Sequence, residues 1–272
     1  MKFKHLIIIF NIVIIFFLSA VALLPVLFMG SDFALVFWQS GWPLALILVL
    51  ALVVLNVFFL QNYRLFMLLE REDWPALVDH LEQTVLGKGR YSYRRVRLLV
   101  NSYLVMSDSA AVLRLESKVA IAKPALLESN ALAFGAARIL GGDLKGAAEF
   151  FQTRLEKGKA AETQWIRWFY GFSLVLASVF DKAEGEFKAL ASASNDAIIA
   201  GLSAYFLANT LLKHSLNPAE CRSLADGGHE RVKKTLKNIE GWKKEAAKVE
   251  TEVHAAIIKK YIDEAGIWLF RA

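Results

Sequence analysis

The side chains that most often bind metals or perform acid–base chemistry are few and scattered in this sequence of 272 residues. The five histidines are His5, His80, His214, His229 and His254. No two of them stand three or four positions apart, so they offer no ligand pair on one helix face. Cys221 is the single cysteine, which excludes a zinc site built from several thiolates and an intrachain disulfide. We therefore expect no metal site.

Motifs for other kinds of catalysis are equally weak. The doublets Gly141-Gly142 and Gly227-Gly228 are typical of helix ends rather than of a phosphate-binding loop that follows a strand. Glu70, Glu72 and Asp73 form an acidic cluster, but one that resembles a solvated helix end more than an acid–base pair. The sequence predicts a protein that is not an enzyme and that carries no cofactor.

Aromatic and basic side chains are the best candidates for recognition of another molecule. Trp165 and Trp168 lie in a dense aromatic run that also contains Arg167, and Arg138 lies in the preceding helical segment. Aromatic rings at this density cannot all enter one core, so some are expected at a contact surface. We predict a partner-binding surface that combines Arg138, Trp165, Arg167 and Trp168, although most of the aromatic run is expected in the core.

Two long apolar stretches precede these residues. Residues 6–29 contain one strongly polar residue, Asn11, and residues 43–61 contain Asn56 and a terminal glutamine. At 1.5 Å per residue each stretch can cross a hydrocarbon layer of about 30 Å. The sequence predicts two transmembrane helices with lipid contact through residues 6–61. The alternative for the first stretch is a secretory signal peptide, because Ala20-Val21-Ala22 has the pattern of a cleavage site.

The distribution of charge orients the predicted spans. Lys2 and Lys4 precede the first span and Arg64 and Arg71 follow the second, whereas the external loop at residues 30–42 carries only Asp32. We expect a multi-pass protein of the bacterial inner membrane with both termini and the helical domain in the cytoplasm. The formal charge of +6 then reflects the membrane rather than a nucleic acid partner.

The chain after residue 64 has apolar residues at spacings of three and four and no convincing strand pattern, which predicts an all-α domain. Helix ends are expected at Asp73-Trp74-Pro75, Gly87-Lys88-Gly89, Gly141-Gly142-Asp143 and Asn217-Pro218, where caps, glycines and prolines gather. We expect helical hairpins over residues 65–225.

Internal similarity gives these hairpins a period. Three residues recur after 36 positions: Gly135, Ala147 and Phe151 are matched by Gly171, Ala183 and Phe187. A small residue on each helix with an aromatic one turn later resembles the tetratricopeptide repeat (TPR), in which these positions bring paired helices together. The resemblance implies a TPR-like α-helical solenoid, whose alternative is an ordinary helical bundle. Two apolar spans followed by such repeats are also similar to the layout of HemY-type proteins, which are associated with haem biosynthesis.

The C-terminal segment, residues 226–272, carries one apolar stripe. Its members follow helical spacing: Val232, Leu236, Ile239, Trp242, Ala246, Val249, Val253 and Ile257. We predict an amphipathic helix that caps the open end of the solenoid. The alternative is a contact with another copy or another protein, which would make the chain a homo- or hetero-oligomer.

Stacked hairpins offer extended surfaces to other proteins and seldom carry chemistry. The sequence therefore favours a membrane-anchored scaffold or adaptor with protein partners. Two alternatives stay open: a structural subunit of an envelope machine for motility, secretion or division, and a HemY-like protein of the haem pathway.

Overall fold

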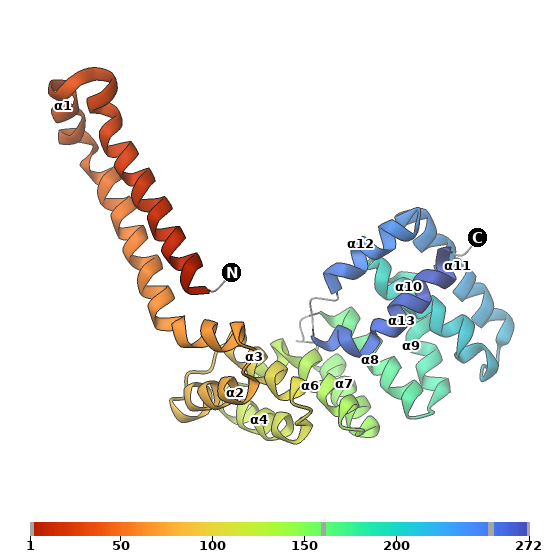
Figure 1. The fold of residues 1–272 in the computed structure, drawn as a ribbon. Coiled ribbons are helices and arrows are strands. Elements are labelled where there is room, and N and C mark those ends of the chain that lie inside the picture. Colours follow the sequence, from red (N-terminus) through yellow and green to blue (C-terminus); the bar gives the residue numbers. More distant parts are fainter. Residues whose placement is uncertain (1–2, 159–161, 250–252, 271–272) are drawn as a thin grey trace. The chain divides into compact units, whose positions relative to one another are not determined.

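A computed structural model describes residues 3–158, 162–249 and 253–270 of the chain, and in these ranges the structure contains helices and no strand (Figure 1). The expected all-α fold is confirmed. The chain divides into two compact units, Met1–His80 and Leu81–Ala272.

The first unit is built around α1 (Phe3–Glu70), which is interrupted at Gly30. Gly30 has a φ of 83° and a ψ of 171°, a conformation that side chains other than glycine rarely adopt. On either side of this residue the helix forms two apolar arms that run side by side (Figure 1). Asn56 Nδ2 donates a hydrogen bond of 2.8 Å to Asn11 Oδ1, and the rings of Phe10 and Phe59 lie 5.9 Å apart.

The apolar segments Ile8–Asp32 and Gly41–Glu70 are long enough to cross a membrane by length and composition. The first of them also fits a signal sequence. The second continues beyond the predicted limit at residue 61, because α1 remains helical to Glu70.

Helix α2 (Trp74–Glu82) crosses the boundary between the two units, which lies after His80. The rest of the second unit consists of short helices. The helices are η1 (Gln83–Gly87, a π-helical turn), α3 (Tyr93–Val105), α4 (Ser109–Ala122), α5 (Pro124–Ser129), α6 (Ala131–Leu140), α7 (Leu144–Lys157), α8 (Thr163–Leu176), α9 (Phe180–Ala193), α10 (Ala197–Asn209), η2 (Leu211–Lys213, a 3-10 turn), α11 (Pro218–Leu236), α12 (Ile239–Val249) and α13 (Val253–Phe270). Consecutive helices form the hairpins α3/α4, α6/α7 and α8/α9, and α10 packs on α11.

The turns of these hairpins share one backbone geometry. Ser107, Gly142 and Ser178 each have a positive φ, and Glu72 has it in the turn between α1 and α2. At Gly142 the turn is closed by two hydrogen bonds, from the Gly142 N–H to the Ile139 carbonyl (3.1 Å) and from the Asp143 N–H to the Arg138 carbonyl (3.0 Å). The other three turns repeat this pattern, which is the Schellman motif. The left-handed residues are 35, 35 and 36 positions apart, from 72 to 107, 142 and 178.

In two of the hairpins an aspartate caps the N-terminus of the second helix by accepting a hydrogen bond from a backbone N–H of its first turn. Asp108 accepts a hydrogen bond from the Ala111 N–H at 2.9 Å, and Asp143 accepts one from the Gly146 N–H at 3.0 Å. Asp73 serves α2 in the same way, as its position before a proline predicts. These local signals explain why the hairpin boundaries can be read from the sequence.

The C-terminal segment differs from the prediction of one helix over residues 226–272. Residue 226 lies inside α11, which ends at Leu236 and is followed by Lys237, whose φ is 63°. Asn238 caps α12 through the Gly241 N–H at 2.9 Å, and a Cβ at Gly241 would lie 2.2 Å from the Leu236 carbonyl oxygen. The prediction of a single helix is wrong, because the chain makes a tight turn at Lys237 and Asn238. In this turn the Asn238 side chain accepts a hydrogen bond from a backbone N–H at the start of α12. Residues 250–252 and 271–272 of the predicted segment lie outside the described residues.

Helix α13 folds back over the first helices of the hairpins. Helix α13 contacts α6, α10, α11 and α12. Tyr261 of α13 places its ring 5.5 Å from Phe172 of α8 and 5.1 Å from Phe206 of α10. The faces of α8 and α10 that carry these rings are therefore covered by α13.

Candidate functional site

The six residues predicted to pack the hairpins lie in their interiors. A Cβ at Gly135 of α6 would lie 2.1 Å from Phe151 Cζ of α7, and a Cβ at Gly171 of α8 would lie 3.2 Å from Phe187 Cζ of α9. Ala147 and Ala183 are also fully buried. In both hairpins a glycine therefore lets the two helices approach across an aromatic ring.

The four residues of the predicted partner surface do not share one environment. Trp168 is fully buried, with its ring 5.2 Å from Phe172 and 5.7 Å from Phe206. The prediction is wrong for Trp168, because this indole fills the core between α8 and α10. Trp165 is half-buried, and its ring lies 6.2 Å from Trp168.

The two arginines of that surface are held by carboxylates. Arg167 forms an ion pair of 3.4 Å with Glu186, and its side chain is 46% exposed. Burial raises the pKa of Glu186, and the nearby Arg167 partly opposes this rise. Arg138 pairs with Glu116 of α4 and is largely buried. Of the four residues, Arg167 is the one with a substantially exposed side chain.

A cluster of cations around Phe150 was not predicted. The guanidinium carbons of Arg138 and Arg154 lie 4.5 Å and 3.9 Å from the centre of the Phe150 ring. Arg154 Nε lies 3.7 Å from Glu128 Oε2, and both groups are mostly buried. The cluster ties α5, α6 and α7 together through cation–π and ionic contacts. The signal in the sequence is the spacing of Phe150 and Arg154 on one helix face, but their partners come from other helices.

Polar contacts hold α13 against α10 and α11. The Tyr205 hydroxyl of α10 donates to Glu264 Oε2 at 2.8 Å, and a His229 ring nitrogen of α11 lies 2.9 Å from the Leu269 carbonyl oxygen. Burial, together with the hydrogen bond to Glu264, raises the pKa of Tyr205 to about 12. These contacts join three separate segments of the sequence.

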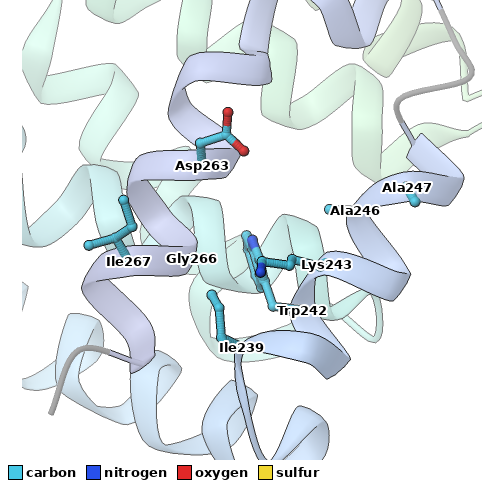
Figure 2. A pocket seen from close by; sticks show the side chains of 8 residues that line it. All are labelled: Ile239, Trp242, Lys243, Ala246, Ala247, Asp263, Gly266 and Ile267. Atoms are coloured by element: carbon cyan, nitrogen blue, oxygen red, sulfur yellow. The ribbon is translucent and has the colours of Figure 1, made fainter.

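A groove of about 590 Å³ lies between α12 and α13 (Figure 2). Helix α12 contributes one wall through Ile239, Trp242, Lys243, Ala246 and Ala247, and α13 contributes the other through Asp263, Gly266 and Ile267. The lining is apolar except for Lys243 and Asp263, which stand on opposite walls. Trp242 and Ile239 belong to the predicted apolar stripe, but no local pattern pairs them with α13.

Trp242 forms the fixed part of this groove. Its Nε1–H donates to the Ile262 carbonyl at 3.1 Å, and its side chain is buried. A Cβ at Gly201 would lie 2.6 Å from Trp242 Cζ3, and a Cβ at Gly266 would lie 2.6 Å from Trp242 Nε1. The indole is thus held between glycines of α10 and α13, so the groove is largely preformed.

The described residues hold no group of three or more His, Cys, Asp or Glu side chains that is placed to bind a metal ion. Cys221 is buried, and its thiol lies 3.6 Å from the Leu207 carbonyl oxygen. Burial raises the pKa of this thiol, which lowers its reactivity as a nucleophile.

Comparison with known proteins gives one similar protein that spans both units. It comes from Treponema pallidum (strain Nichols), carries the description "Uncharacterized protein", and is 28% identical over 287 residues. The alignment covers 99% of this chain and 88% of that protein. No solved structure matches the chain. A sequence family described as "Uncharacterised Treponema protein" matches residues 111–271, which is more than half of the chain and includes every helix from α5 to α13, and the chain belongs to this family.

Proposed function

We propose that the protein is a membrane-anchored adaptor in which a TPR-like solenoid binds other proteins at the cytoplasmic face of a bacterial inner membrane. The observation that carries the proposal is the recurrence of one turn geometry every 35 or 36 residues, close to the period of about 34 that the repeat uses. The hairpins α6/α7 and α8/α9 also share the same glycine–phenylalanine contact, so their packing repeats as well as their turns. Stacked repeats of this kind commonly serve as binding surfaces.

The two apolar arms of α1 support the anchor. Most of their described side chains are exposed in the absence of a membrane, and the two asparagines are hydrogen-bonded to each other. A polar side chain in hydrocarbon needs such a partner, because an unsatisfied group there costs several kcal/mol. The excess of Lys and Arg at both ends of the hairpin favours cytoplasmic termini.

The position of the C-terminal stripe favours an adaptor over a structural subunit. A subunit that assembles through this stripe would need to expose it, whereas Val232, Trp242 and Ala246 are buried within the chain itself. Because α13 covers part of α8 and α10, partners are expected on the outer faces of the hairpins and around Arg167 rather than at Trp168.

Crosslinking in intact cells with a lysine-reactive reagent, followed by mass spectrometry, tests this proposal. An adaptor gives links from the hairpins to several soluble proteins. Helix α8 contains no lysine, so Arg167→Glu should weaken links from Lys182 and Lys188 of α9, the helix that carries the partner of Arg167, Glu186. The matched control is Arg114→Glu on the exposed face of α4, at a side chain that is 68% exposed. Recovery of one fixed set of membrane subunits, with links confined to residues 229–270, would replace the adaptor by a structural subunit.

A further inference from the structure

The groove between α12 and α13 combines an apolar lining with one cation and one anion on facing walls (Figure 2). Lys243 has a side chain that is 64% exposed and lies 3.0 Å from Glu240, which does not line the groove. Asp263 is also exposed. A ligand with an apolar body and both a negative and a positive group could pair with Lys243 on one wall and with Asp263 on the other.

The rim of the groove exposes an apolar side chain that the fold itself does not use. Ile267 is 53% exposed, whereas Ile258, Ile262, Ala265 and Leu269 of the same helix are buried in the protein. An exposed large aliphatic side chain beside an apolar hollow marks a surface that gains from being covered. The volume of about 590 Å³ lies within the range of small-molecule sites, roughly 300–1,000 Å³.

We infer that this groove binds a single-chain zwitterionic amphiphile of the lysophospholipid class. The acyl chain lies along Ile239, Trp242 and Ile267, the phosphate faces Lys243, and the ammonium group faces Asp263. A fatty acid would satisfy Lys243 but would place its carboxylate near Asp263, and an alkylamine would have the reverse mismatch. The charge pair therefore selects for a headgroup that contains both signs.

This inference rests on the groove alone and does not depend on the adaptor proposal. A protein that binds the amphiphile without protein partners, or partners without the amphiphile, separates the two ideas.

The test uses the full-length protein in amphipol, free of detergent, and a lysophosphatidylcholine that carries a diazirine on its acyl chain. Mass spectrometry after irradiation should find label within residues 239–267. Lys243→Ala and Asp263→Asn should each weaken binding of this probe about fivefold, the effect expected for loss of one partly exposed ion pair. Both side chains are exposed, so the variants should fold as the parent does.

A second probe makes the test specific for charge. Lysophosphatidylglycerol lacks the ammonium group, so Asp263→Asn should strengthen its binding about fivefold while it weakens that of lysophosphatidylcholine. Ile267→Asn should reduce labelling by both probes. Ile121→Asn, at a side chain that is 87% exposed on α4 and distant from the groove in sequence, should leave labelling unchanged. Labelling of residues 239–267 that does not respond to Lys243→Ala and Asp263→Asn would overturn the inference.

Discussion

The contact between Gly135 and Phe151 leaves no room for even one methyl group, because a Cβ at Gly135 would lie 2.1 Å from the aromatic ring. Gly135→Ala should therefore destabilise the protein by about 1–3 kcal/mol, the usual range for overpacking a core. The control is Gly185→Ala on α9, where the added Cβ meets nothing within 4 Å. That change should stabilise the helix by about 0.5–1 kcal/mol. Urea unfolding followed by circular dichroism measures both, and equal effects of the two substitutions would refute the packing role of Gly135.

The hydroxyl of Tyr205 should make the stability of the protein depend on pH. Its pKa is raised to about 12 in the folded protein, above the ordinary value of 10.0, so the folded state keeps this proton longer than the unfolded state. The resulting stability is fully present below pH 10 and is lost as pH rises from about 10 towards 12. Tyr205→Phe should flatten this decline and should cost about 1 kcal/mol at pH 8 through loss of the hydrogen bond to Glu264.

Urea unfolding midpoints between pH 8 and pH 11 measure this dependence. The exposed Tyr63 provides the control Tyr63→Phe, which should keep the wild-type slope. The role of Tyr205 would be disproved by a Tyr205→Phe variant whose stability falls with pH as steeply as that of the wild type. Part of the decline should remain in every variant, because burial and the hydrogen bond to Glu82 also raise the pKa of Tyr103.

At the scale of elements, the hairpin turns are equivalent in backbone but not in residue type. The left-handed position is a glycine at Gly142 and a serine at Ser107 and Ser178. No atom lies within 4 Å of a Cβ placed at Gly142, so the cost of Gly142→Ala comes from the backbone alone. We expect a loss of about 1 kcal/mol for this change and a gain of similar size for Ser107→Gly.

Thermal unfolding of the two turn variants checks this expectation, with opposite shifts in Tm as the predicted result. Shifts of the same sign would mean that the two turns are not equivalent and that the hairpins do not form a regular repeat.

At the scale of the whole molecule, the apolar hairpin and the helical unit make a topology that can be tested directly. Single cysteines at Asp32→Cys and Glu72→Cys, in a Cys221→Ser background, should react differently with a thiol reagent that does not cross the membrane. Asp32→Cys should be labelled in intact spheroplasts, whereas Glu72→Cys should be labelled only after lysis. Labelling of neither cysteine before lysis would contradict an external loop.

A measurement on the same cells can distinguish a membrane anchor from a cleaved signal peptide. Cleavage after Ala22 would shorten the chain by 22 residues, so the mass of the mature protein decides between the two interpretations of the first apolar stretch. We expect the uncleaved mass and retention in the membrane after an alkaline carbonate wash.

The sequence by itself determined the features that depend on neighbours along the chain. The all-α class, the two apolar segments and the turn at Gly142-Asp143 follow from helical spacing, capping and glycine conformation, which act over a few residues. The recurrence of Gly135 and Phe151 at Gly171 and Phe187 also led directly to close contacts, because the two members of each pair belong to adjacent helices of one hairpin.

Only the tertiary structure decided where distant helices meet. The burial of Trp168 depends on Phe206, and the groove beside Trp242 depends on Asp263, Gly266 and Ile267, all supplied by helices that no local signal joins to their partners. The break at Lys237 separates α11 from α12 within the segment predicted as one amphipathic helix, and α13 packs its Tyr261 ring against α8 and α10. Apolar spacing tells a helix which face to bury but does not say against what, because the hydrophobic effect has no direction and the covering partner is set by the path of the whole chain.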